Sequence, residues 1–385
     1  MGNIVKKATA GTMESSDVYV ELTPSDNGIE LELDSVVYHQ FGDEILKVVR
    51  EVLEEFDVQN AKVSWWTEAH WSASCGPESR RPFYGGRRRR TMRRSMLFLP
   101  GNTPNMIING EALGSDAIIL DLEDAVAPQE KDSARILVRN ALKYQGFGGC
   151  ETIVRINALD TEHWRRDLDE IVPMRPNFIM PPKTGCAGDI LELDAYLTQL
   201  EKKLGFAPNT VRIIALIETA LGVENAYHIA SASARLAALF LGGEDLTADL
   251  RCQRTKAGEE IRYARQRLVC AARAAGIDVY DTPFTDVNDD EGIWDDASFA
   301  KGLGFTGKAA ISPRHVAAIN QVFRPSEQEI AYAYEVMETI RLAKEQGRGA
   351  VSLRGKMIDA PIVSRAQQTI AMAEELQGKG GASYE

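Results

Sequence analysis

The feature that most constrains the fold is a regular alternation of apolar runs and helical patterns between residues 93 and 324. Eight runs have the length and character of buried parallel strands. They lie at residues 96–99, 117–122, 152–156, 178–181, 211–217, 236–241, 279–284 and 307–311. Eight βα units in about 220 residues predict a (β/α)₈ TIM barrel, whose chemistry lies at the carboxyl ends of the strands. A doubly wound sheet is the alternative, but no G-x-G-x-x-G sequence follows the first run.

Two acidic residues stand at the ends of neighbouring predicted strands. Glu218 closes the run 211–217, and Asp245 follows the run 236–241. Their carboxylates are therefore expected to lie side by side, as an oxygen-rich pair suited to one Mg²⁺ whose other ligands are water or substrate oxygens. On spacing alone, a helix cap and a surface charge explain the two residues equally well.

Charged and polar residues also end most of the other predicted strands. They are Asn102, Asp121, Glu123, Asp124, Arg155, Lys183, Asp281, Thr282, Asp286, Ser312 and Arg314. Any one of them alone is more often a cap or an ion pair. Together they predict a pocket for a metal ion and an anionic substrate.

Shorter segments flank the predicted barrel, which spans residues 92–324. Residues 18–22 and 29–33 alternate around a turn at Ser25–Gly28 and predict a β-hairpin. With a helix at 41–56 and a strand from 60, they form a small α+β domain over residues 1–63. Residues 325–385 predict helices at 327–346 and 362–376 that bracket a loop at 353–361, which we interpret as a C-terminal helical lid.

Composition excludes several classes of protein. The net charge of −12 argues against nucleic acid as the main partner. No apolar run of eighteen residues and no signal-peptide pattern occur, which argues against a membrane partner and against secretion. The five cysteines are scattered without Cys-x-x-Cys spacing, so we predict a cytoplasmic protein without structural zinc.

Four motifs give the barrel segment a family resemblance: RSMLFLPGN at 94–102, LDLEDAV at 120–126, ETALG at 218–222 and GKMIDAP at 355–361. Together they resemble the citrate lyase beta subunit, within the broader malyl-CoA lyase and HpcH/HpaI aldolase-like family. The resemblance implies Glu218 and Asp245 as Mg²⁺ ligands and Arg155 as the group that binds substrate oxygens. It also implies that Glu123 and Asp124 hold metal-bound waters, and we add Lys183 to the substrate pocket.

The same resemblance implies a reaction and an oligomer. The expected substrate is a citryl thioester, cleaved to oxaloacetate and an acetyl thioester with Mg²⁺ chelating the tertiary hydroxyl and its adjacent carboxylate. Asp359 is expected to reach the site of a neighbouring subunit and to protonate the enolate carbon. A lid supplied in this way requires a homo-oligomer, and we expect a trimer or a multiple of one. The base that deprotonates the hydroxyl is not assigned.

The first 63 residues have a resemblance of their own. Residues 10–17 (AGTMESSD), the predicted hairpin and residues 40–43 (QFGD) resemble the acyl carrier (gamma) subunit of citrate lyase. This implies that Ser15 carries a CoA-derived phosphoribosyl dephospho-CoA group and that the citrate lyase alpha subunit is a partner. A solvated loop is the ordinary alternative for such a serine.

Residues 64–91 fit neither resemblance. They hold a cluster of tryptophans and an arginine-rich run without helical or strand periodicity. We interpret them as an irregular linker produced by a frameshift that joined two adjacent genes, with Met92 close to the natural start of the second. The carrier domain would then be incomplete.

Two other functions stay open at this point. One is a lyase for free CoA thioesters such as malyl- or citramalyl-CoA. The other is a non-catalytic carrier and scaffold within a lyase complex, against which the intact Glu218, Asp245 and Arg155 count.

Overall fold

The computed structural model of the chain describes residues 8–10, 18–25, 28–35, 46–47, 49–50, 53–54, 58–67, 92–345 and 351–380. The chain divides into two compact units, Met1–Arg88 and Arg89–Glu385. The predicted attachment residue Ser15 lies outside the described residues, as do residues 68–91 of the predicted linker. None of the described helices is long and apolar enough to cross a membrane.

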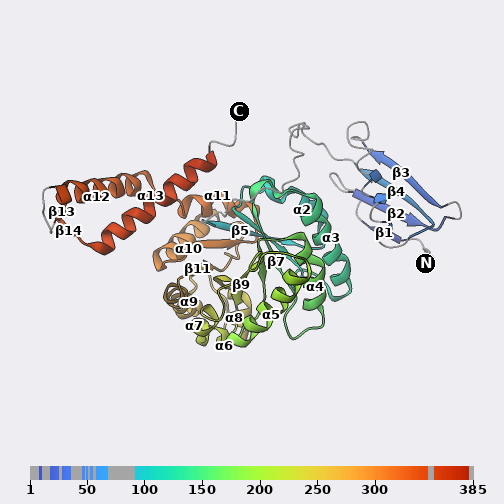
Figure 1. Ribbon diagram of the computed structural model, residues 1–385, viewed down its shortest axis with the longest axis horizontal. Coiled ribbons are helices and arrows are strands. Elements are labelled where there is room, and N and C mark those ends of the chain that lie inside the picture. Colours follow the sequence, from blue (N-terminus) through green and yellow to red (C-terminus); the bar gives the residue numbers. More distant parts are fainter. Residues whose placement is uncertain are drawn as a thin grey trace. The chain divides into compact units, whose positions relative to one another are not determined.

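The N-terminal unit contains a four-stranded sheet (Figure 1). Its strands are β1 (Ala8–Ala10), β2 (Val18–Thr23), β3 (Ile29–Ser35) and β4 (Ala61–Thr67), in the order β1-β2-β4-β3. The predicted hairpin pairing of β2 with β3 is therefore wrong, because β4 lies between them. The insertion places Val63 opposite Leu22 on one side and Leu31 on the other, within one small apolar core.

Strand β4 also runs past the predicted domain boundary at residue 63. Residues 64–67 continue its pairing with both neighbours, so that Thr67 lies opposite Val18 of β2 and Ser35 of β3. The boundaries between the carrier-like domain, the linker and the barrel remain predictions.

The second unit contains the predicted closed barrel of eight parallel strands (Figure 1). Neighbours follow the order of the chain, and β12 closes the barrel by pairing with β5. The strands are β5 (Ser95–Pro100), β6 (Ala117–Asp121), β7 (Glu151–Arg155), β8 (Phe178–Met180), β9 (Arg212–Ile217), β10 (Leu236–Leu241), β11 (Asp278–Asp281) and β12 (Gly307–Ala310).

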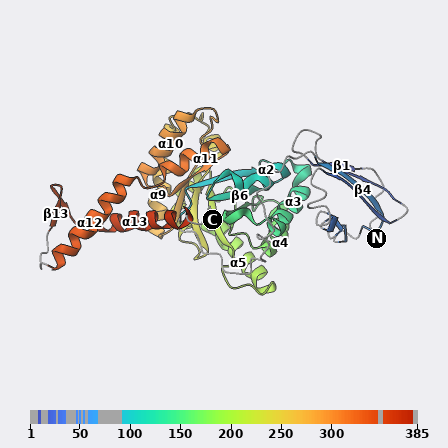
Figure 2. The ribbon, with the colours of Figure 1, turned by 90° about the horizontal axis from the view of Figure 1, so that it is seen from above.

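Helices surround these strands in both ribbon views (Figures 1 and 2). They are α2 (Pro104–Asn109), α3 (Lys131–Tyr144), α4 (His163–Ile171), α5 (Ala187–Lys203), α6 (Ala220–Glu224), α7 (Ala226–Ala230), α8 (Gly243–Asp249), α9 (Arg262–Ala275), α10 (Asp290–Leu303) and α11 (Pro313–Val322). Because each helix returns the chain to the start of the next strand, all strand carboxyl ends meet at one end of the barrel, which we call the mouth.

Two apolar layers hold the barrel together. Alternate strand residues such as Ile119, Phe178 and Phe240 fill the interior, while their neighbours pack against the helices. Both faces of each strand are therefore buried, which explains why the strands read as continuous apolar runs. The same alternation decides whether a residue at a strand end points into the mouth or outward.

The C-terminal segment is helical, as predicted, with a small hairpin that sequence reasoning missed. Helices α12 (Glu327–Glu345) and α13 (Ala360–Gly380) are joined through strands β13 (Val351–Leu353) and β14 (Lys356–Ile358). They share a core of their own that includes Val336, Ile358 and Ala366.

Closure of the barrel depends on a glycine. A Cβ atom at Gly307 of β12 would collide with the main-chain carbonyl of Arg93, whereas one at Gly302 in α10 would meet no atom within 4 Å. We predict that Gly307→Ala lowers the free energy of unfolding by about 1–3 kcal/mol through overpacking. The matched change Gly302→Ala should raise it by up to about 1 kcal/mol through helix propensity. Chemical denaturation measures both, and equal effects would contradict the account.

Candidate active site

Charged residues from neighbouring strand ends meet at the mouth. Glu123 and Asp124 follow β6, Arg155 ends β7, Lys183 follows β8, Glu218 follows β9, and Asp245 lies in the first turn of α8 after β10. We call these residues the mouth cluster. Ion pairs and, for Glu218, a hydrogen bond from the backbone N–H of Lys183 join its members, so the structure brings together the predicted metal and substrate residues of the barrel.

Lys183 lies at the centre of the mouth cluster. Its Nζ is 2.5 Å from Glu123 Oε1 and 3.8 Å from carboxylate oxygens of both Asp124 and Asp245. Burial alone would lower the pKa of this amine, but the hydrogen bond to Glu123 and the charges of Glu123 and Glu218 raise it above its ordinary value. Lys183 therefore remains a cation.

The main chain of Lys183 has a second role. Its φ of +51° is in the left-handed region, which is uncommon for a residue with a side chain. In this conformation its backbone N–H donates a hydrogen bond of 2.8 Å to Glu218 Oε1. Backbone strain at this position is thus linked to the orientation of a proposed metal ligand.

Glu218 is a buried carboxylate with little to balance its charge. Its side chain is 2% exposed. Burial, followed by repulsion from Asp245 and Glu123, raises the pKa of Glu218 to about 8. The carboxylate fits only because residue 242 is glycine, since a Cβ there would lie 2.5 Å from Glu218 Oε2.

Arg155 is held in place by the carboxylate of Asp121 and the ring of Phe98. Its Nε and Nη2 donate hydrogen bonds of 2.7 and 2.6 Å to the two oxygens of Asp121, and its guanidinium lies 5.3 Å from the centre of the Phe98 ring. Its Nη1 lies 3.1 Å from Glu123 Oε2. Burial alone would lower the pKa of Arg155. The hydrogen bonds to Asp121 outweigh this effect, so that the pKa of Arg155 lies above its usual value. The sequence places Asp121 among the residues of the predicted pocket but gives it no role of its own.

The donor set fits Mg²⁺ and not a metal held wholly by protein. Among the residues that the structure describes, no three or more His, Cys, Asp or Glu side chains form a metal-binding group. Glu218 and Asp245 are instead a pair. Mg²⁺ is commonly bound by one or two carboxylates while it keeps several waters, and its charge would relieve the repulsion that raises the pKa of Glu218.

One residue predicted for the pocket, Asp281, lies elsewhere. Asp281 faces outward between β11 and the helices, fully buried, with Lys308 Nζ at 2.6 Å and Arg265 at 2.9 Å. Asp286 pairs with Lys256, and Arg314 with Asp290. The expectation that Asp281 faces the substrate pocket is wrong, because Arg265 and Lys308 hold its carboxylate in the outer layer. The expectation for Asp286 and Arg314 remains a prediction.

Asp359 belongs to the C-terminal hairpin and not to the mouth cluster of its own chain. Its side chain is exposed, and Oδ1 accepts a hydrogen bond of 3.2 Å from the N–H of Ile362 at the start of α13. Its expected role in a neighbouring site remains a prediction.

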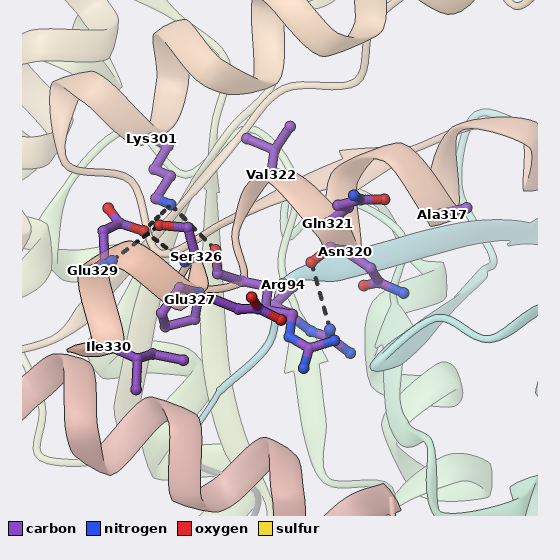
Figure 3. Close-up of a pocket in the computed structure, with 12 residues that line it drawn as sticks. Arg94, Lys301, Ala317, Asn320, Gln321, Val322, Ser326, Glu327, Glu329 and Ile330 are labelled. Carbon is purple, nitrogen blue, oxygen red and sulfur yellow. Dashed lines mark hydrogen bonds and ion pairs between the residues drawn. The ribbon is translucent and has the colours of Figure 1, made fainter.

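A pocket of about 670 Å³ lies at the other end of the barrel, where α12 leaves α11 (Figure 3). Its charged groups bind one another: Arg94 pairs with Asp116 and donates to the carbonyl of Asn320, and Lys301 lies 3.8 Å from Glu329. The Lys301–Glu329 contact joins α12 to the barrel, and none of these contacts involves the mouth cluster.

Comparison with known proteins decides the family. Residues 94–313 match the family model described as HpcH/HpaI aldolase/citrate lyase. The chain belongs to this family. It is 43% identical to the citrate lyase subunit beta of Leuconostoc mesenteroides subsp. cremoris, over 73% of this chain and 93% of that protein. It is 35% identical to an L-malyl-CoA/beta-methylmalyl-CoA lyase of Cereibacter sphaeroides, over 73% and 94%.

Solved structures agree with this assignment. Protein CitE from Mycobacterium tuberculosis, in complex with magnesium, acetoacetate and coenzyme A, matches with a TM-score of 0.60 and 30% identity, over 74% of this chain and 99% of that one. The citrate lyase beta subunit of the same organism, complexed with oxaloacetate and magnesium, gives 0.53 and 31%, over 61% and 98%. Residues 5–65 match a second family model, ACP, described as malonate decarboxylase delta subunit (MdcD), which supports a carrier-like N-terminal region.

The raised pKa of Glu218 predicts that the metal-free protein becomes less stable to unfolding as the pH rises. A group whose pKa is raised by folding stabilises the fold below its unfolded pKa and loses that contribution as the pH rises through the folded value. Glu218→Gln should therefore be more stable than the parent at pH 8. Its advantage should shrink towards pH 5 by up to about 1.4 kcal/mol per pH unit. Denaturation in EDTA measures this difference, and a difference that is constant with pH would contradict it.

Glu201 provides the matched control. It is also 2% exposed, but Arg235 lies 2.8 Å away. Burial would raise the pKa of Glu201, and the bonds from Arg235 and from backbone N–H groups lower it overall. Glu201→Gln should therefore destabilise the protein equally at pH 8 and pH 5, and less so only below the ordinary pKa of 4.5, which is the opposite behaviour.

Proposed function

We propose that the barrel is a Mg²⁺-dependent carbon–carbon lyase that cleaves a citryl thioester to oxaloacetate and an acetyl thioester. The observation that carries the proposal is the mouth cluster, in which a carboxylate pair lies beside a fixed guanidinium. The relatives named citrate lyase subunit beta, and the related structure that holds oxaloacetate and magnesium, support the same reaction.

In this proposal Glu218 and Asp245 hold the metal, and Glu123 and Asp124 orient its waters. When bound, Mg²⁺ supplies a Lewis acid that lowers the pKa of the substrate's tertiary hydroxyl. The buried Glu218 loses its proton on metal binding, and Lys183 keeps its carboxylate oriented through the backbone N–H.

Arg155 stabilises negative charge on substrate oxygens during cleavage. Its guanidinium is fixed by Asp121 before substrate arrives, so little reorganisation is needed as charge develops. Its raised pKa keeps it charged at every working pH. Lys183 adds a second cation that can contact a substrate carboxylate.

Asp359 is proposed to act on a neighbouring subunit. Its carboxylate is exposed on the C-terminal hairpin, where a second copy can present its mouth cluster to it. When protonated there it would deliver a proton to the enolate carbon, which leaves the acetyl thioester. This arrangement requires a homo-oligomer, and we propose a trimer or a multiple of one.

The N-terminal region would carry the substrate. The match to a carrier-type family supports a prosthetic group, which we propose is phosphoribosyl dephospho-CoA attached to Ser15. A thioester on that arm would be loaded by a citrate lyase alpha subunit, in the cytoplasm. The frameshift origin of residues 64–91 remains part of this proposal.

A lyase for free CoA thioesters is the second candidate. The 35% identity to malyl-CoA lyases and the coenzyme A in the CitE complex favour it. A non-catalytic scaffold is disfavoured, because a buried carboxylate whose pKa is raised to about 8 is typical of a functional site.

The decisive assay uses the purified full chain with citryl-CoA and follows oxaloacetate through malate dehydrogenase. We expect activity that needs Mg²⁺ and that Asp245→Ala lowers by more than about 100-fold, because a metal ligand is lost. Asp169→Ala on the outer helix α4 is the control and should retain activity. Cleavage of malyl- or citramalyl-CoA alone would favour the second candidate, and no cleavage of any thioester would favour the scaffold.

Co-expression of two inactive variants tests the neighbouring-subunit role of Asp359. Asp245→Ala and Asp359→Ala should each be inactive alone. In mixed oligomers about a quarter of the sites combine an intact Asp245 with an intact Asp359 from the adjacent copy, so activity should return to about that fraction. Mixed oligomers as inactive as either parent would place Asp359 in the site of its own chain.

A further inference from the structure

We propose that Asp121 is the positioning residue of this site, which holds Arg155 and the loop that carries Glu123 and Asp124 in one arrangement. The inference rests on the proposed function and assigns Asp121 no contact with substrate. Asp121 is the last residue of β6 and is 2% exposed.

Each carboxylate oxygen of Asp121 accepts two hydrogen bonds. Oδ1 accepts from Arg155 Nε at 2.7 Å and from the N–H of Glu123 at 2.9 Å. Oδ2 accepts from Arg155 Nη2 at 2.6 Å and from the N–H of Ala125 at 3.2 Å. One carboxylate thus joins the side chain of the next strand to the backbone of its own loop.

The hydrogen bonds to Asp121 occupy two of the three guanidinium nitrogens of Arg155 and leave the third facing the mouth. Asp121 takes Nε and Nη2, and this two-pronged contact fixes the plane of the group. Nη1 is left to face Glu123 at 3.1 Å and Asp124 at 3.6 Å. Nη1 is therefore the nitrogen positioned for substrate oxygens.

The loop after β6 is held from two sides. Asp121 binds the N–H groups of Glu123 and Ala125, while Lys131 Nζ donates to the carbonyls of Leu122 and Glu123 at 2.8 and 2.6 Å. The carboxylates proposed to orient metal-bound waters are therefore placed by the same residue that places Arg155.

A substitution that keeps the size of the side chain tests whether Asp121 acts through its hydrogen bonds or only by filling space. Asp121→Asn keeps the shape but presents an NH₂ group, a donor, to a neighbour that is itself a donor. We expect kcat for citryl-CoA to fall by about 10–100-fold with little change in KM, because the lost interaction acts on developing charge. Calorimetry should also show Mg²⁺ binding weakened by about tenfold, because the loop carboxylates lose their fixed place.

Asp167→Asn is the matched control. Asp167 is fully buried, accepts from Arg135 Nε at 2.7 Å and from the N–H of Asn157 at 2.9 Å, and lies in the outer layer on α4. It should lose comparable thermal stability but keep kcat and Mg²⁺ affinity. Equal losses of kcat and affinity in both variants, or parental values in Asp121→Asn, would overturn the proposal.

A longer acid covers the case in which Asp121→Asn does not fold. Asp121→Glu keeps the charge but displaces the oxygens by one methylene, so it should fold, keep KM and lower kcat. A parental kcat in this variant, with Asp121→Asn unfolded, would assign Asp121 to folding alone and overturn the proposal. If the parent protein binds Mg²⁺ but cleaves no citryl-CoA, the proposed function fails, while the Mg²⁺ comparison still decides the role of Asp121.

Discussion

The site depends on a carboxylate that the fold keeps away from water. Closing eight parallel strands places Glu218 at a strand end where its side chain is 2% exposed, next to Asp245 and Glu123. Burial of an unbalanced negative charge is expensive unless a cation is close. Lys183 and Arg155 offset only part of this charge, because they also serve Glu123 and Asp124. A bound dication would complete the balance, and it is the proposed source of the barrel's chemistry.

Other contacts of the mouth make room for the Glu218 carboxylate and orient it and its neighbours. Gly242 leaves room for the carboxylate, and the left-handed backbone of Lys183 turns an N–H towards it. On the other side Asp121 fixes Arg155 with both its oxygens. These groups come from successive strands, so the closed barrel brings them together without a dedicated scaffold. The proposed contribution of the C-terminal segment is Asp359, which would need a second copy of the chain.

Much of this arrangement was predictable, and the exceptions have physical causes. The barrel and the Glu218–Asp245 pair follow from apolar runs that end in acids. The direction of a residue at a strand end does not, because strands buried on both faces have no alternation to read. Asp121 and Arg155 therefore face the interior, while Asp281 faces Lys308 in the outer layer. The pairing of β4 between β2 and β3 was missed for a related reason, since local alternation does not specify distant partners.

The most direct test of the account locates the metal itself. Crystals of the full chain grown with Mn²⁺ in place of Mg²⁺ would show the ion by its anomalous scattering. We predict one strong peak between the carboxylates of Glu218 and Asp245, with waters completing an octahedral shell. Mn²⁺ bound elsewhere in the barrel, with these two carboxylates left to Lys183 and Arg155, would contradict the assignment of the mouth as a metal-dependent lyase site.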